Sequence, residues 1–326
     1  MRLTAVTRVL NEEDIVEPFI RHHAAFVGAH ILLDNGSADR TLDILASLRR
    51  EGFNLAVYQN ASPVFVEPIY NTALLRAVLE GDAPDWVLFL DCDEFIDDRA
   101  APGGLVAALR AAPPEAASVE LPMLDYLAAT DATASALNCV ERLVLRQPEP
   151  ELGPKVFVRR PPDPERLAMP AGGHFLRIDN LVAPGPRLDG VHLAHFPECS
   201  IAQFAAKAII GRLKVMATGK EDATLRWNAH YDATFDALRA DPAAWLGDAE
   251  AKLAQRAASG RLVHDPVAYR GGDLAYTVPH DPLRHAVSAI LRHAESLATA
   301  YGRLMDGVPA AGQRVVAEAS SFTRVL

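Results

Sequence analysis

The sequence predicts an α/β fold, with a doubly wound, mostly parallel sheet followed by a mostly helical C-terminal extension. Over the first hundred residues, short β-prone runs alternate with segments of helical periodicity. The fourth β-prone run, Trp86–Leu90, is apolar throughout, which is typical of a strand buried on both faces of a parallel sheet. From Ser200 onward the patterns are mainly helical.

The first hundred residues contain four strand patterns with helical patterns between them. The expected strands are Leu3–Leu10, Ala29–Leu33, Asn54–Gln59 and Trp86–Leu90. The first helix is expected to begin with Asn11 as its N-cap, the second follows the Asp34–Ser37 turn cluster, and the third spans Ile69–Glu80. In open α/β sheets ligands bind outside the carboxyl ends of the strands. Functional residues are therefore expected at those ends.

After Arg99 the pattern is less regular. A short helix is expected at Leu105–Arg110, and strands at Ser118–Met123, Cys139–Arg146 and Gly190–Phe196. The proline-rich stretch Gln147–Pro170 predicts an irregular excursion. Helices are expected at Ile201–Thr218, at Thr234–Ser259 with interruptions at Pro242 and Gly247, and at Leu283–Met305. A boundary near Ser200 would divide the chain into a catalytic domain, residues 1–199, and a helical extension, residues 200–326.

Composition and charge exclude some classes of function. The chain has 326 residues and a formal net charge of −10, which disfavours nucleic acid as a partner because basic surfaces supply most of that affinity. No apolar run is long enough to span a bilayer, and charged residues follow Met1 too soon for a secretory signal. Three well-separated cysteines (Cys92, Cys139 and Cys199) fit free thiols in a reducing compartment. A cytoplasmic location is therefore expected.

The strongest motif is FLDCDEF at Phe89–Phe95. An apolar strand leads into Asp91 and Asp93, and residues two apart on extended chain point to the same side. Both carboxylates could therefore reach one divalent cation such as Mg²⁺ or Mn²⁺, which is commonly shared with substrate phosphates. Triplets of this kind also arise by chance at turns. The position after a fourth strand favours the functional interpretation.

The sequence resembles the glycosyltransferase family 2-like enzymes. The resemblance rests on NEEDIVEPFIRHH, LLDNGSADRT, FLDCDEF and HLAHFPECSIAQFAAK, in this order over residues 1 to 207. It implies a GT-A fold with the D-x-D motif, a nucleoside-diphosphate sugar as donor and a divalent metal, Mn²⁺ or Mg²⁺. It identifies neither the sugar nor the acceptor, which could be a glycan or another hydroxyl compound.

The resemblance also assigns roles to individual residues. Thr7, Arg8 and Asn11 match positions that line the base and ribose pocket, and Asp34 matches an aspartate that hydrogen-bonds the nucleobase. Asp91 would face the ribose and the metal, Asp93 would bind the metal, and His195 would complete the metal site. Asn11 and Asp34 also have structural interpretations, as a helix cap and a turn residue. His192 and His195 should face opposite ways on a strand.

The general base is less defined. Transfer with inversion needs a carboxylate to accept the proton of the attacking hydroxyl, and Asp125 and Glu141 are the candidates. A retaining mechanism would need no such base there, so the stereochemistry stays open. Lys155, Arg159 and Arg160 form a basic cluster that could bind phosphate or acceptor, or could simply be solvated.

Other classes of enzyme fit less well. A phosphatase with D-x-D would carry it after its first strand, a nucleotidyltransferase would carry a glycine-rich basic loop near the N-terminus, and a dinucleotide enzyme would carry G-x-G-x-x-G. A catalytically inactive GT-A-like nucleotide- or sugar-binding module is the main alternative. The function expected is metal-dependent glycosyl transfer, in the synthesis of a surface or secreted glycan.

Overall fold

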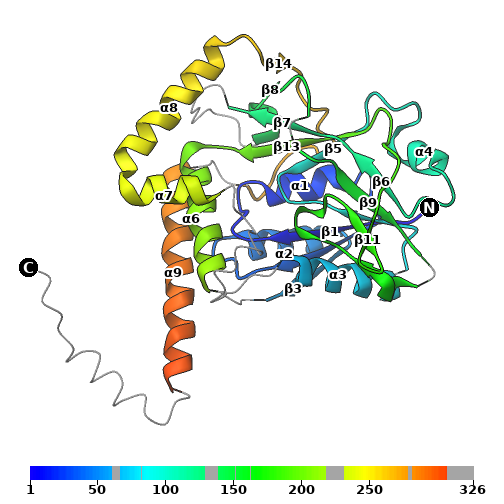
Figure 1. The fold of residues 1–326 in the computed structure, drawn as a ribbon, viewed down its shortest axis with the longest axis horizontal. Coiled ribbons are helices and arrows are strands. Elements are labelled where there is room, and N and C mark those ends of the chain that lie inside the picture. Colours follow the sequence, from blue (N-terminus) through cyan, green and yellow to red (C-terminus); the bar gives the residue numbers. More distant parts are fainter. Residues whose placement is uncertain are drawn as a thin grey trace, which may run out of the picture.

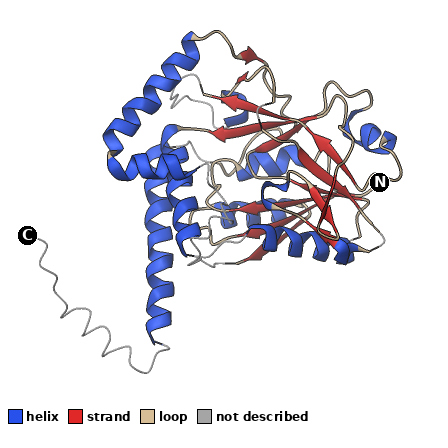
Figure 2. Ribbon diagram, viewed as in Figure 1, coloured by secondary structure: helices blue, strands red, loops and turns tan. Residues whose placement is uncertain are grey.

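The protein is described by a computed structural model, in which residues 1–60, 67–81, 83–128, 139–150, 152–161, 163–217, 231–277 and 281–306 are placed. Three sheets and the helices around them form the fold (Figures 1 and 2). The largest sheet has the strand order β3-β2-β1-β4-β9-β6. Its first four strands are β1 (Leu3–Val9), β2 (Ala29–Asp34), β3 (Leu55–Gln59) and β4 (Trp86–Phe89), and they pair in parallel. The mixed, mainly parallel α/β architecture expected from the sequence is confirmed at this level.

Helices cover both faces of this sheet because its strands are apolar on both sides. Helices α1 (Val16–His23), α2 (Thr41–Glu51) and α3 (Glu67–Gly81) alternate with the first four strands. One core cluster includes Ala5 and Val9 of β1, and a second cluster on the opposite face includes Val6. Burial of both faces explains why β4 reads as four consecutive apolar residues.

The edge of this sheet differs from the prediction. Residues 155–159, expected to be irregular because prolines surround them, form β9 (Lys155–Arg159), which pairs antiparallel with β4 and with β6 (Ser118–Leu121). The sequence KVFVR is itself β-prone, and the prolines lie outside it. That expectation was wrong, and it concealed the strand that brings Lys155 next to the D-x-D segment.

A second sheet, β14-β8-β7-β13-β5, begins where the first sheet ends. Its strands are β5 (Glu94–Asp97), β7 (Met123–Leu127), β8 (Leu145–Arg146), β13 (His192–Glu198) and β14 (Val263–His264). Strand β13 is parallel to β7 and antiparallel to β5. The triplet Asp91–Asp93 therefore connects β4 of the first sheet to β5 of the second.

Three local predictions need correction. The strand expected at Cys139–Arg146 is a short helix, α5 (Cys139–Arg142), followed by β8. Asn11 does not cap α1, whose N-cap position is Ile15; Asn11 adopts a left-handed conformation with φ of 57°. The single strand expected at Ser118–Met123 is divided between β6 and β7. The remaining small elements are α4 (Gly104–Ala111), η1 (Pro164–Arg166), β10 (Leu167–Ala168), η2 (Ala171–Gly173), β11 (Leu176–Ile178) and β12 (Leu181–Ala183).

The C-terminal part is mostly helical, as expected. Its helices are α6 (Ile201–Ala217), α7 (Asp232–Ala240), α8 (Pro242–Ala258) and α9 (Pro282–Asp306). Pro242 separates α7 from α8, whereas Gly247 lies within α8 without ending it. Helix α6 packs on β13 and on α9, and α9 runs along one side of the molecule with its last turns beyond the sheets (Figure 1).

The segment before α9 returns to the N-terminal part. The buried carboxylate of Glu17 on α1 accepts hydrogen bonds from the backbone of Ala275, Tyr276 and Thr277, at 2.6–2.8 Å. The boundary near residue 200 stays a prediction. Among the described residues no helix is both long enough and apolar enough to cross a membrane.

Candidate functional site

A cavity of about 570 Å³ lies at the carboxyl ends of β1 and β4, between the D-x-D segment and helix α6. Six of the candidate residues singled out in the sequence line it: Arg8, Asn11, Asp91, Asp93, Lys155 and His195. Charged residues without an assigned role also line it, namely Glu12, Glu67, Glu94, Lys207 and Lys214. The cavity therefore combines carboxylates with cationic side chains, and their pairing determines what it can bind.

Asp91 is paired with two cations. Lys155 Nζ lies 2.7 Å from Asp91 Oδ2, and Arg8 Nη2 lies 3.1 Å from Asp91 Oδ1. Desolvation in the cavity favours the protonated acid, but the charges of Lys155 and Arg8 outweigh it and hold the pKa of Asp91 below its ordinary value. Asp91 is therefore an anion with both oxygens engaged.

Lys155 is also bound to a second carboxylate. Its Nζ lies 2.6 Å from Glu94 Oε1, while Glu94 Oε2 accepts a hydrogen bond from the backbone N–H of Asp91 at 2.9 Å. Lys155 is only 2% exposed, so it needs these anions to remain charged. Burial and the nearby charge of Asp91 raise the pKa of Glu94 against the effect of Lys155. Glu94 thus fixes both the lysine and the backbone of the D-x-D turn.

Asp93 has a separate cationic partner. Lys207 Nζ on α6 lies 2.8 Å from Asp93 Oδ2, in an ion pair that joins the helical extension to the D-x-D segment. Burial opposes ionisation of Asp93, but the charges of Lys207 and His195 lower its pKa overall. Within the described part of the chain, no hydrogen bond is formed by the other carboxylate oxygen, Oδ1.

His195 and Asp125 form a pair on neighbouring strands. They are directly opposite in the parallel register of β13 and β7, and His195 Nδ1 lies 2.8 Å from Asp125 Oδ1. Burial lowers the pKa of His195, but the hydrogen bond to Asp125 and the charge of Asp93 raise it more, so the net shift is upward. The backbone N–H of Phe196 donates to the carbonyl of Asp93 at 2.8 Å, which holds β13 beside the D-x-D segment.

The other predicted residues lie outside the lining of the cavity. Thr7 points to the opposite face of β1 from Arg8, and its buried hydroxyl has no hydrogen-bond partner in the described residues. Asp34 is fully buried, and its carboxylate accepts hydrogen bonds from the backbone of Gly36 and Ser37 at 3.1–3.2 Å. The proposed contact of Asp34 with a nucleobase stays a prediction, beside this observed structural role.

The two candidates for the general base differ in position. Asp125 reaches the cavity only through His195, to which it is hydrogen-bonded. Glu141 is exposed on α5 and does not line the cavity. Asn11 does line it, while its side-chain oxygen accepts a hydrogen bond from the backbone of Ala38 at 2.9 Å and orders the adjacent loop.

The residues expected to bind the metal line one cavity, but their donor atoms are not arranged as a closed ligand set. Among the described residues, one group of three has donor atoms that all lie within 4.8 Å of one another, and it consists of Glu13, Asp39 and His285. Asp91 and Asp93 instead pair with lysines. His195 lines the cavity and, within the described ranges, its Nε2 makes no hydrogen bond. Asp93 and His195 thus offer donor atoms to an ion. Asp91 would have to release Lys155 or Arg8 before its carboxylate could bind the same ion.

Sequence reasoning did not assign Lys207 a role. A signal was present, because Lys207 and Lys214 are two turns apart in an otherwise mostly apolar stretch of α6. Both lysines line the cavity. Burial and the charge of Arg8 lower the pKa of Lys214 to about 8. Two lysines on the same face of a largely buried helix indicate that an anionic group lies next to them inside the fold.

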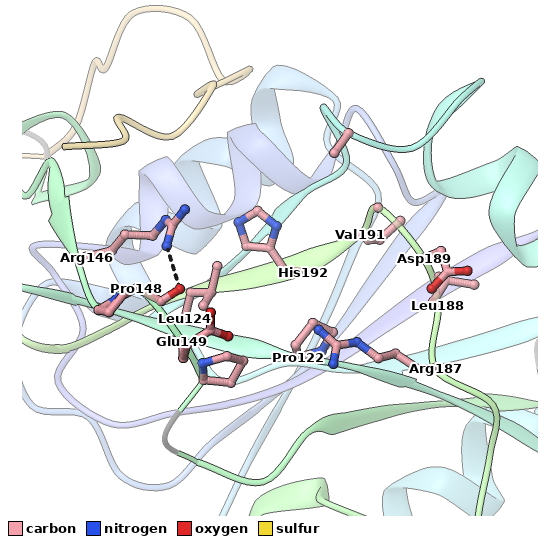
Figure 3. Close-up of a pocket in the computed structure, with 13 residues that line it drawn as sticks. Pro122, Leu124, Arg146, Pro148, Glu149, Arg187, Leu188, Asp189, Val191 and His192 are labelled. Atoms are coloured by element: carbon pink, nitrogen blue, oxygen red, sulfur yellow. Dashed lines mark hydrogen bonds between the residues drawn. The ribbon is translucent and has the colours of Figure 1, made fainter. Parts of the chain in front are cut away.

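A second cavity, of about 440 Å³, lies on the other side of β13 (Figure 3). His192 lines it together with Arg146, Glu149 and Arg187. His195 faces the first cavity instead, so the expectation that His192 and His195 point to opposite sides of the strand is confirmed. Arg146 is bound to Asp265, with 2.7 Å between Nε and Oδ2.

No protein-family model and no curated protein matches the chain. Solved structures do match. A mycobacterial protein has 21% identity and a TM-score of 0.37 over 68% of this chain and 76% of its own. A mannosyltransferase from Pyrobaculum calidifontis, solved with GDP-Man and Mn²⁺, has 15% identity and a TM-score of 0.38 over 94% of this chain and 88% of its own. A glucosyl-3-phosphoglycerate synthase from Mycobacterium tuberculosis has 20% identity and a TM-score of 0.34, over 68% and 81%. These scores are low. They do not establish a shared activity.

Proposed function

We propose that the chain is a glycosyltransferase that moves a sugar from a nucleoside-diphosphate sugar to a hydroxyl of a glycan or another acceptor. One observation carries this proposal. Asp91 and Asp93, at the end of a buried parallel strand, face a single cavity in which each is paired with a lysine, at 2.7 and 2.8 Å. Such a cavity offers cations to a diphosphate and carboxylates to an ion or a sugar hydroxyl.

The cationic residues have a direct role in this proposal. A diphosphate leaving group gains negative charge as the bond to the sugar breaks, and fixed cations stabilise that charge. Lys207 and Arg8 line the cavity from two different elements, one from α6 and the other from β1. Repulsion between a diphosphate and the two aspartates is therefore weaker than the acidic sequence suggests.

A divalent cation, Mn²⁺ or Mg²⁺, is part of the proposal. The residues fit it: Asp93 and His195 would hold the ion, with Asp91 joining when Lys155 or Arg8 moves to the phosphates. When bound, the ion would supply Lewis-acid neutralisation of the diphosphate. Asp125 holds the His195 ring by its Nδ1, so Nε2 is directed away from that hydrogen bond. We therefore assign Asp125 a positioning role, acting through His195.

The test is a nucleotide screen on the full-length chain. Thermal unfolding is followed with UDP, GDP and ADP, each with and without Mn²⁺, because a ligand that binds the native state raises its stability. One nucleoside diphosphate is expected to raise Tm selectively, and the matching nucleotide sugar should then be hydrolysed or transferred. Absence of any shift for every nucleotide at millimolar concentration would refute the proposal. A shift without turnover would instead favour the inactive binding module.

A further inference from the structure

Helix α9 has an apolar seam on its exposed side. The seam consists of residues spaced alternately by four and by three, as in the a and d positions of a coiled coil, namely Leu283, Val287, Ile290, Ala294, Leu297, Tyr301 and Leu304. Leu283 and Leu304 are each 67% exposed, and Tyr301 is 51% exposed. Ile290 and Leu297, in the middle of the seam, are half-buried.

A different face of α9 makes the contacts with the rest of the chain. His285, Ala286, Ala289 and His293 are buried, and α6 packs against the helix. The seam lies to one side of this buried face. An apolar strip of this length on a helix that is already packed elsewhere indicates a partner.

We propose that the seam is the interface of an antiparallel dimer, in which α9 packs against α9 of a second copy. A two-fold axis near Arg292 would place Leu283 beside Tyr301 of the second copy. The same axis would place Val287 beside Leu297 and Ile290 beside Ala294, which pairs larger with smaller side chains. A two-fold interface of this kind needs a self-complementary surface, and a repeated a/d seam provides one.

The charge distribution favours a second copy as the occupant. The chain carries a net charge of −10, so most of its surface repels another copy. Helix α9 carries three arginines (Arg284, Arg292 and Arg303) against Glu295 and Asp306, which gives 3 − 2 = +1. Arg284 is the one charged residue at the positions that flank the seam, so antiparallel pairing does not bring like charges together.

The shape of the molecule is compatible with this arrangement. Most of α9 lies against the body, and its last turns extend beyond the sheets (Figure 1). In an antiparallel pair, the body of each copy would lie beside the projecting end of the other helix. Residues His285 and Ala289 of α9 also line the candidate site, so the dimer would fix a wall of that cavity.

The test compares the oligomeric state of three proteins by light scattering over a range of concentrations. The wild type should be dimeric, and the double variant Val287→Glu/Tyr301→Glu should be monomeric with its Tm retained. The control, Ser288→Glu/Thr299→Glu, adds the same charge to the same helix away from the seam and should stay dimeric. Binding of the nucleotide identified in the screen is measured in parallel as a check on folding.

Cross-linking decides the orientation even if the glutamate variant does not fold. The native cysteines are buried, so single cysteines on the seam can be oxidised selectively. A mixture of Leu283→Cys and Tyr301→Cys chains should form a mixed disulfide dimer, whereas either variant alone should not. Self-cross-linking of Leu283→Cys alone would indicate a parallel pair and refute the antiparallel arrangement.

Other occupants of the seam would give different results. A wild-type chain that is monomeric at all concentrations, but dimerises when residues 307–326 are removed, would mean that the chain covers its own seam. Flotation of a monomeric wild type with vesicles of phosphatidylcholine and phosphatidylglycerol would indicate a lipid surface. Either result would overturn the dimer.

Discussion

Lys207 on α6 and Asp93 in the D-x-D segment form an ion pair across the candidate site, with 2.8 Å between Nζ and Oδ2. The two residues are 114 positions apart. The pair makes the helical extension a part of the site, because α6 supplies a cation that faces the D-x-D turn. Its removal should therefore change ligand binding more than folding.

The first prediction follows from this pair. Lys207→Met should weaken binding of the nucleoside diphosphate by roughly ten-fold or more, since hydrogen bonds to charged groups contribute about 1.5–3 kcal/mol. Lys207→Arg should restore part of the affinity. Calorimetry measures both, with Lys252→Met on the exposed side of α8 as the control. Equal affinity in the Lys207 and Lys252 variants would show that Lys207 does not contact the phosphates.

The second prediction concerns Asp93. Asp93→Asn should keep the fold but abolish metal-dependent turnover, because an amide is neutral and a poorer ligand for a hard cation. Turnover is measured with Mn²⁺ and with excess EDTA, beside Asp189→Asn, which changes an exposed aspartate. Full wild-type activity in EDTA would remove the metal from the mechanism and leave Lys155 and Lys207 as the neutralising groups.

The third prediction separates a positioning role of Asp125 from a catalytic one. If Asp125 orients His195, Asp125→Asn should lower the affinity for Mn²⁺ by about ten-fold or more, as such outer residues typically do. Binding is followed by electron paramagnetic resonance of free Mn²⁺. Glu141→Gln should leave this affinity unchanged. Unaltered Mn²⁺ binding together with lost transfer in Asp125→Asn would favour proton transfer instead.

The fourth prediction concerns Asp34. Its carboxylate accepts hydrogen bonds from the backbone of Gly36 and Ser37 and from the side chain of Gln59. Asp34→Ala should lower the free energy of unfolding by about 1–3 kcal/mol, the cost of leaving buried donors unpaired. Urea unfolding measures it, and calorimetry at saturating Mn²⁺ tests the nucleobase contact separately. Unchanged nucleotide affinity in a folded Asp34→Ala chain would leave Asp34 with the structural role alone.

The fifth prediction is a pH dependence of the contact between α9 and the loop after β1. His285 Nδ1 lies 3.5 Å from Glu13 Oε1. The hydrogen bond to His285 lowers the pKa of Glu13 to about 2. Burial lowers the pKa of His285, but Glu13, Asp14 and Asp39 raise it overall, to about 9. Arg40 also faces Glu13, to which its backbone N–H donates a hydrogen bond.

The sign of the effect differs for the two groups. The raised pKa of His285 stabilises the fold fully below pH 6.5 and loses its effect as pH rises through 9. The lowered pKa of Glu13 stabilises the fold above pH 4.5 and loses its effect as pH falls through 2. Urea unfolding of wild type and His285→Gln should therefore differ most near pH 5.5 and least near pH 9.5. A difference that does not change with pH would contradict the ion pair.

Sequence reasoning predicted the first four strands because their apolar pattern reports burial directly. It also placed Asp91, Asp93 and His195 at one cavity, since each follows or lies on a strand that ends there. It missed β9 because flanking prolines suggested a loop, and it gave Lys207 no role. The partner of a buried lysine depends on which distant segments meet, and local patterns do not contain that information.

The same limit applies to α9. Helical periodicity identified its apolar residues, but two apolar faces on one helix cannot be distinguished until the packing of α6 is known. Val287 and Tyr301 are exposed, and the buried face is formed largely by small residues and histidines, including Ala286, Ala289 and His293. Periodicity shows that a helix has an apolar side without showing what covers it.

The contact between Glu17 and the backbone of Ala275 and Thr277 has a consequence for how the chain unfolds. An early helix and a segment about 260 residues later share one buried carboxylate. A fragment ending at residue 199 would keep the ion pair of Glu17 with Arg21, at 2.9 Å, but Oε2 of Glu17 would lose its donors from Tyr276 and Thr277 and would have to be hydrated. The two ends of the described chain therefore lose their structure together, and hydrogen exchange in α1 should report the opening of the segment before α9.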